Sequence, residues 1–173
     1  MNILFHTATA VGIIAVLADS REEVASKTNE YSKAAVAFVI GVISHGALDY
    51  IPHCYPINSR VDVIAGAIIM TMLTFLSKPN YRWMVGLAFI GCIFPDLIDL
   101  SPEILNKFFG LSIPVYENIF PWHWEKYSGS IFIDDCMVSN FNHLLVVIVV
   151  VLICLNRKDD LRKIFKYKRD VLL

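Results

Sequence analysis

The sequence predicts an all-α fold, an integral membrane bundle of about five helices with an amphipathic segment at the membrane interface. One reason is the composition: 56% of the 173 residues are hydrophobic and 18% are charged, and the mean hydropathy is +0.57. Such values are typical of membrane proteins. The other reason is the pattern, because polar connectors separate five apolar segments, at residues 3–18, 34–52, 61–77, 82–94 and 143–156.

These five segments are predicted to form helices, although several are shorter than the ~20 residues that a full membrane span needs. The helices therefore extend into flanking polar residues or stop partway. The first segment also resembles a signal peptide ending at Ala18. We expect it to be retained, because no Lys or Arg precedes it and His6 interrupts it.

The predicted organisation is a single helical membrane domain over residues 1–156, followed by a basic cytoplasmic tail over residues 157–173. A chain of this length has room for one compact unit. The net charge of −1 gives no reason to expect a nucleic-acid partner. The four cysteines show no CxxC spacing, and Cys92 and Cys154 lie within apolar runs, where packing is the expected role.

The distribution of Lys and Arg predicts the orientation in the membrane. With five crossings, alternate connectors place 12 of these residues on one side and 3 on the other, and the C-terminal tail is on the richer side. The positive-inside rule then places the C-terminus in the cytoplasm and the N-terminus outside.

Segment 95–142 is too rich in apolar and aromatic residues to be a simple loop. Pro95 precedes apolar residues at helical spacing, which predicts a short amphipathic helix over about residues 95–110 in the membrane interface. The stretch FPWHWEKY then supplies Trp122, Trp124 and Tyr127, the aromatic residues favoured at headgroup depth.

Ionisable residues gather at the predicted outer ends of the helices. His45 and Asp49 are spaced i,i+4 and share a helix face, and Asp96 and Asp99 are spaced i,i+3. Such groups are costly at this depth unless they are paired. No Lys or Arg is embedded beside them, so a divalent metal would supply the positive charge. Mixed His and Asp ligation suits zinc best, with manganese or iron as alternatives, and the predicted ligands are His6, His45, Asp49, Asp96 and His143.

Each of these residues also has a simpler explanation. A single membrane histidine such as His6 or His143 commonly forms a hydrogen bond between helices. His45 and Asp49 are compatible with an intrahelical pair, and Asp96 and Asp99 with a helix start favoured by the helix dipole. Only their joint occurrence favours a metal site.

Four motifs, FHTATAVG, GVISHGALDYIPH, GCIFPDLID and NHLL, together resemble those of small bacterial membrane-bound metal-dependent hydrolases. The LexA-binding, inner-membrane-associated hydrolase family is the best-named relative, and a distant similarity to zinc-dependent phospholipase C is implied for that group. The resemblance implies a bacterial cytoplasmic membrane, ligands at His6, His45, Asp49 and Asp96, and a second acid at Asp99. The order of the elements differs from that of many relatives, and NFNHLL, with His143, stands where the family has a longer His-containing element.

The resulting hypothesis is a membrane-embedded metal-dependent hydrolase that acts on a phosphoester or lipid-like ester at the outer leaflet. A metal-activated water would attack the ester, with Asp99 as base or second ligand and His123 or His53 as the acid for the leaving group. Membrane lipid is the expected partner, and the oligomeric state is not predicted. The alternatives are a metal-ion or proton transporter and a non-enzymatic membrane partner protein that binds through its basic tail.

Overall fold

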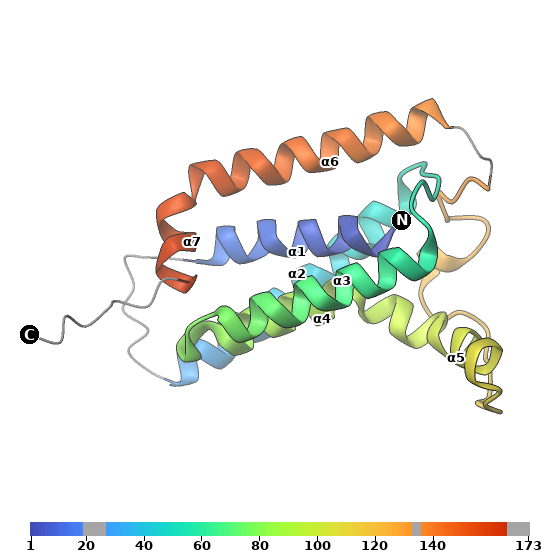
Figure 1. Ribbon diagram of the computed structural model, residues 1–173, viewed down its shortest axis with the longest axis horizontal. Coiled ribbons are helices and arrows are strands. Elements are labelled where there is room, and N and C mark those ends of the chain that lie inside the picture. Colours follow the sequence, from blue (N-terminus) through green and yellow to red (C-terminus); the bar gives the residue numbers. More distant parts are fainter. Residues whose placement is uncertain (19–26, 133–135, 166–173) are drawn as a thin grey trace, which may run out of the picture.

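A computed structural model describes residues 1–18, 27–132 and 136–165. Within them the chain forms seven α-helices and no β-strand, which confirms the all-helical fold (Figure 1). A 3₁₀ turn, η1 (Pro121–His123), lies in the connection between the fifth and sixth helices. The α-helices are α1 (Ile3–Leu17), α2 (Lys27–Tyr50), α3 (Ser59–Leu76), α4 (Pro79–Asp99), α5 (Ser101–Phe109), α6 (Met137–Asn156) and α7 (Lys158–Phe165).

Four of these helices, α2, α3, α4 and α6, are long and apolar enough to cross a membrane. Their outward faces carry exposed apolar side chains that suit contact with lipid, among them Ile64, Ile68 and Phe75 on α3 and Leu144, Leu152 and Leu155 on α6. The remaining predicted crossing forms α1, whose 15 residues span about 22 Å, less than the ~30 Å of a bilayer core.

α1 occupies the centre of the bundle, where it contacts α2, α3, α4, α6 and α7 (Figure 1). A helix that is apolar on all sides is expected to be surrounded by other elements. Its N-terminus is held from α3, because the Asp62 carboxylate accepts hydrogen bonds from the backbone N–H groups of Ile3 and Leu4, at 2.7 and 3.0 Å. This contact places the first turn of α1, and with it His6, beside the ends of α2 and α4.

The most extensive contact between described helices is that of α2 with α4, and a small residue makes their approach possible. A Cβ atom added at Gly41 would lie 2.8 Å from the backbone nitrogen of Cys92. Small residues at such crossings let helix backbones approach closely in membrane proteins. The close approach brings His45 and Asp49, which follow Gly41 on α2, to the side of Asp96 on α4.

The end of the bundle away from these residues has an apolar core, made of Ala10, Ile14, Ala37, Met84, Val85, Ala88 and Phe89 with their neighbours. The first part of the predicted tail forms α7, which folds back onto this core through the buried Ile164. Arg157 donates hydrogen bonds to the carbonyl oxygens of Ala15, Val16 and Ala18 at the end of α1. Residues 166–173 of the predicted tail lie outside the described residues.

The boundary between α4 and α5 differs from the expectation that a helix starts at Pro95. α4 continues through Pro95 to Asp99, and α5 starts at Ser101 with Pro102 in its first turn. Proline is tolerated within membrane helices because neighbouring groups satisfy the backbone that it frees. Asp96 and Asp99 therefore stand on the last turn of α4.

Candidate metal centre

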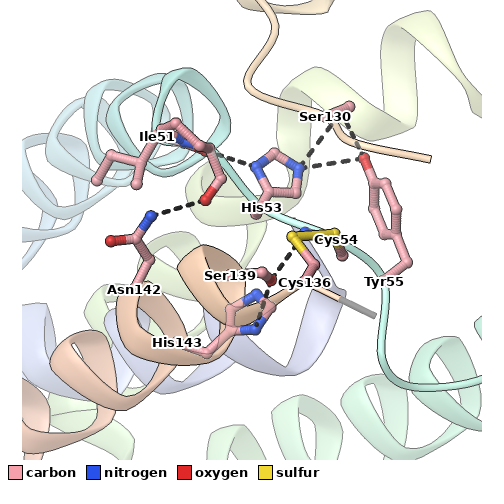
Figure 2. The surroundings of a disulfide bond; sticks show 10 residues. Ile51, His53, Cys54, Tyr55, Ser130, Cys136, Ser139, Asn142 and His143 are labelled. Atoms are coloured by element: carbon pink, nitrogen blue, oxygen red, sulfur yellow. Dashed lines mark hydrogen bonds between the residues drawn. A yellow bond between two sulfur atoms is a disulfide. The ribbon is translucent and has the colours of Figure 1, made fainter. Parts of the chain in front are cut away.

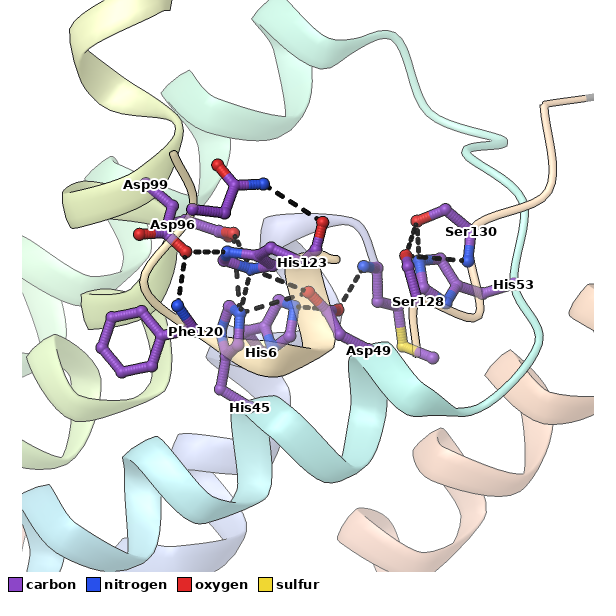
Figure 3. Close-up of polar contacts among 12 residues, drawn as sticks. His6, His45, Asp49, His53, Asp96, Asp99, Phe120, His123, Ser128 and Ser130 are labelled. Carbon is purple, nitrogen blue, oxygen red and sulfur yellow. Dashed lines mark hydrogen bonds and ion pairs between the residues drawn. The ribbon is translucent and has the colours of Figure 1, made fainter. Parts of the chain in front are cut away.

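Three helices and one connecting segment converge at the end of the bundle where α1 starts and α2 and α4 finish (Figure 3). Four side chains there, His45, Asp49, Asp96 and His123, each offer one ligand atom, and these atoms all lie within 4.8 Å of one another. His45 and Asp49 come from α2, Asp96 from α4 and His123 from η1. The four residues can hold a divalent metal ion, and we call them the four-ligand group.

The spacing of the ligand atoms fits a single small cation. His45 Nε2 lies 3.3 Å from His123 Nε2, 3.2 Å from Asp49 Oδ2 and 3.5 Å from Asp96 Oδ1. His123 Nε2 lies 3.4 and 3.3 Å from the same two oxygens. An ion bound tetrahedrally with ligands at about 2.0–2.1 Å places neighbouring ligand atoms roughly 3.3–3.4 Å apart, so these five distances match such an ion.

The hydrogen bonds behind both histidines direct their lone pairs at this position. His45 Nδ1 lies 2.7 Å from the carbonyl oxygen of Cys92, which only accepts, so Nδ1 carries the proton. His123 Nδ1 is held in the same way by Asp99 Oδ2, at 2.8 Å. Both Nε2 atoms then point at the same position, and in the neutral rings each is an acceptor that a cation could bind. The outer partners also match those of metal-bound histidines.

The carboxylates around His123 also favour positive charge at this position. Burial lowers the pKa of His123, but its contacts with Asp49, Asp96 and Asp99 outweigh burial and raise the pKa to about 10. The α-amino group of Met1 lies 2.5 Å from Asp49 Oδ1. Without an ion, a proton on His123 therefore partly balances the carboxylates at neutral pH.

His123 reaches the group because Asp99 and Gly46 hold its turn in place. The Asp99 carboxylate accepts hydrogen bonds from the backbone N–H groups of Ile119 and Phe120, at 2.9 and 3.0 Å. Trp122 packs against α2 at Gly46, where an added Cβ would lie 2.6 Å from the indole ring. The turn can pack this closely only because Gly46, next to His45, has no side chain.

The other predicted site residues lie around the four-ligand group. His6 stacks on His45 with ring centroids 4.1 Å apart, and its Nε2 lies 3.2 Å from Asp49 Oδ1. His143 is not brought to the group: it stacks on Phe5 and lies 3.2 Å from Ser139 Oγ. His53 lies in a separate group of hydroxyls beyond the end of α2. Asp99 contacts His123 from behind and orients it.

Sequence reasoning treated His123 as a catalytic candidate and did not include it among the ligands. Its position depends on Asp99, 24 residues earlier, and on Gly46, more than 70 residues earlier, so no local spacing reports it. The pair Asp96 and Asp99 is the one signal in the sequence. Two nearby acids are compatible with one that binds the metal and another that accepts a hydrogen bond from a metal-binding histidine.

A cavity of about 970 Å³ opens beside the four-ligand group. Asp49, Asp96 and His123 line one side of it. A second side, from α4 and α5, is apolar and includes Ile93, Leu97, Leu100 and Ile104. The cavity can therefore accept a molecule with an apolar part and a polar part next to the metal position.

A disulfide joins Cys54, after the end of α2, to Cys136, before the start of α6 (Figure 2). The backbone N–H of Cys54 also donates to Ser139 Oγ, at 2.7 Å. Nothing in the spacing of the cysteines predicted this bond, because 82 positions separate them. The disulfide lies at the same end of the bundle as the four-ligand group.

No family model, curated protein or solved structure matches this chain. The resemblance to membrane-bound hydrolases accordingly stays a prediction.

Proposed function

We propose that this protein is a membrane-embedded metal-dependent hydrolase that cleaves a lipid-like ester or phosphoester. One observation carries the proposal: five of the six distances between ligand atoms in the four-ligand group match those around a tetrahedral cation, and the group opens onto a cavity with an apolar wall. Catalytic zinc sites keep a coordination position for water or substrate, or expand to five ligands. An ion held by all four residues would therefore take water as a further ligand from the side of the cavity.

Bound there, a divalent ion would activate water and polarise the scissile group, with zinc the best match to two imidazoles and two carboxylates. The chain's own residues have separate tasks. Asp99 holds the proton on Nδ1 of His123 and so keeps Nε2 free as a ligand. The apolar side of the cavity would exclude water and hold the acyl part of the substrate.

We place this site on the extracytoplasmic face, most simply of a bacterial cytoplasmic membrane. The excess of Lys and Arg in alternate connectors puts the opposite end of the bundle in the cytoplasm. The disulfide between Cys54 and Cys136 supports the same orientation independently, because such bonds persist on the oxidising side of a membrane.

Transport of ions or protons has less support, because a pathway needs polar groups through both halves of the membrane. The described core in the other half is built from apolar side chains such as Ile14, Met84 and Phe89. The ligands instead lie beside a cavity with an apolar wall, which suits a lipid-like substrate.

The test is metal content and hydrolysis measured together in phosphatidylcholine nanodiscs. We expect wild-type protein to retain about one zinc per chain after dialysis, and Asp96→Asn to lose both the metal and hydrolysis of a lipid ester panel. Asp159→Asn, on the exposed surface of α7, is the matched control. His143→Gln discriminates between the ligand sets, because only the set predicted from sequence requires it. Metal-free wild type after zinc loading would refute the proposal, as would hydrolysis that survives Asp96→Asn.

A further inference from the structure

A second polar group borders the cavity beyond the four-ligand group. Three hydroxyls, those of Tyr55, Ser128 and Ser130, line the cavity, and His53 lies behind them, fully buried (Figures 2 and 3). Backbone pairing fixes their positions, since His53 N–H donates to the Gly129 carbonyl and Ile131 N–H donates to the His53 carbonyl, both at 2.8 Å. We call the three side chains the hydroxyl subsite.

The proton arrangement of this subsite follows from the partners of His53. Its Nδ1 lies 2.7 Å from the carbonyl oxygen of Ile51, so Nδ1 carries the proton. Burial lowers the pKa of His53 to about 4, so the ring is neutral at neutral pH. Its Nε2 is therefore an acceptor, and it lies 3.2 Å from Tyr55 Oη and 3.3 Å from Ser130 Oγ.

Every hydroxyl proton of the subsite is used within this chain of hydrogen bonds. Ser128 donates to Ser130 Oγ at 2.9 Å, and Ser130 and Tyr55 share one proton across 2.8 Å. The remaining proton goes to His53 Nε2, whichever of the two hydroxyls supplies it. What the subsite offers to a ligand is oxygen lone pairs, so the ligand must bring hydrogen-bond donors.

The charges around the cavity disfavour an anionic headgroup at this position, and a cationic one would find no carboxylate bonded to the hydroxyl subsite among the described residues. Among the described residues that line it there is no Lys or Arg, and the amino group of Met1 is paired with Asp49. Of the four acids that line the cavity, Asp49 and Asp96 belong to the four-ligand group. Asp62 is satisfied by two backbone N–H groups, and Glu125 is exposed to solvent. A bound phosphate would meet acceptors without a partner charge, which costs free energy.

We infer that the substrate is an amphiphile with an uncharged, hydroxyl-bearing headgroup, of the glycerol or sugar type. The inference rests on the proposed function for the presence of a scissile bond at the four-ligand group. The hydroxyl subsite binds the donors of the headgroup, and the apolar wall formed by α4 and α5 binds the chain.

Three non-hydrolysable ligands with the same chain test the headgroup alone: 1-O-dodecylglycerol, dodecylphosphonate and dodecylamine. Partition of each labelled ligand is measured at pH 8 between phosphatidylcholine nanodiscs with and without the full-length protein. We expect dodecylglycerol to be retained most strongly. Tyr55→Phe and Ser130→Ala should each weaken its retention about three- to tenfold, as for the loss of one hydrogen bond, and change that of dodecylphosphonate less than about twofold.

Ser59→Ala is the matched control, because Ser59 lines the same cavity from the first turn of α3 and lies outside the hydroxyl subsite. Stronger retention of dodecylphosphonate or dodecylamine by wild type overturns the inference. Equal retention of dodecylglycerol by wild type, Tyr55→Phe and Ser130→Ala also overturns it. The result is separable from the proposed function: if the hydroxyl variants behave as expected but no lipid ester is hydrolysed, the hydrolase proposal fails and the headgroup inference stands.

Discussion

Replacing Asp99 by Asn isolates the role of the residue behind His123. Asp99 accepts three hydrogen bonds, from the N–H groups of Ile119 and Phe120 and from His123 Nδ1. Asn has nearly the same volume but only one oxygen. If that oxygen bonds the backbone, the amide NH₂ faces His123 Nδ1, and the imidazole must move its proton to Nε2. That nitrogen then meets the metal position with a proton instead of a lone pair.

We expect Asp99→Asn to lower metal affinity about 10- to 100-fold, the effect of removing the hydrogen-bond partner of a metal-binding histidine. This corresponds to about 1.4–2.7 kcal/mol of binding free energy. The backbone bonds add a cost in stability, because Asn accepts one of the two N–H groups and leaves the other without its carboxylate partner. Each such lost bond costs about 1–3 kcal/mol when the group is buried, and the Asp99 side chain is 1% exposed.

The assay is competition for zinc with a chromophoric chelator at pH 7.5, in nanodiscs. Asp62→Asn is the matched control, because Asp62 is also buried and also accepts two backbone N–H groups, but it contacts neither histidine of the four-ligand group. We expect Asp62→Asn to lower the melting temperature with less than about a threefold change in zinc affinity, near the resolution of such assays. Zinc affinity of Asp99→Asn within twofold of wild type would refute the proposed orientation of His123.

Four further predictions concern the same end of the bundle. The pKa of His123 is raised to about 10, so zinc must displace a proton, and its apparent affinity should rise about tenfold per pH unit between pH 6 and 8; a flat profile contradicts this. The raised pKa also makes the stability of the metal-free protein depend on pH. Protonated His123 contributes its full stabilisation below pH 6.5, the usual pKa of histidine, and this contribution is lost as the pH rises towards 10. Thermal melts across this range will measure the loss. Gly46→Ala should displace Trp122, and thereby His123, and so lower zinc affinity. Gly110→Ala is the control: the added methyl group meets no neighbour, but the residue has φ +63°, so it should lower stability without changing zinc affinity. Cys54→Ser should lower stability by about 4 kcal/mol, the value for opening a loop of this length, and maleimide labelling of Cys136 in wild type should require prior reduction.

The helices could be predicted from apolar runs because a helix that crosses a membrane must consist mainly of apolar residues. Their ends could not, since polar residues outside the lipid continue the helix. Thus α2 starts at Lys27, ahead of the apolar run at residue 34, and α6 starts at Met137, ahead of residue 143. At Pro95 the expected break did not occur, because proline is tolerated in an apolar helix packed against neighbours.

The site divides in the same way. His45, Asp49 and Asp96 lie on helices, where spacing along the sequence reports a shared face. His123 and the hydroxyl subsite lie in an irregular segment, and its course depends on long-range contacts that no spacing encodes. His143 was grouped with the ligands because it begins an apolar run at the same end of the bundle. It faces Phe5 and Ser139 because α6 packs mainly on α1, away from α2 and α4.

The irregular segment between α5 and α6 joins the two halves of the proposed binding site. Asp99 of α4 fixes it at residues 119 and 120, the strand-like pairing with His53 fixes it at residues 129 and 131, and the disulfide fixes Cys136 to the chain that follows α2. Each anchor comes from the end of a helix, and each is polar or covalent, as expected for backbone outside the apolar core of a bilayer. This one segment carries both His123 and the serines of the hydroxyl subsite. In the proposed hydrolase, its anchors would set the separation of the metal position from the headgroup position, so that binding of a headgroup would hold the scissile bond next to the metal.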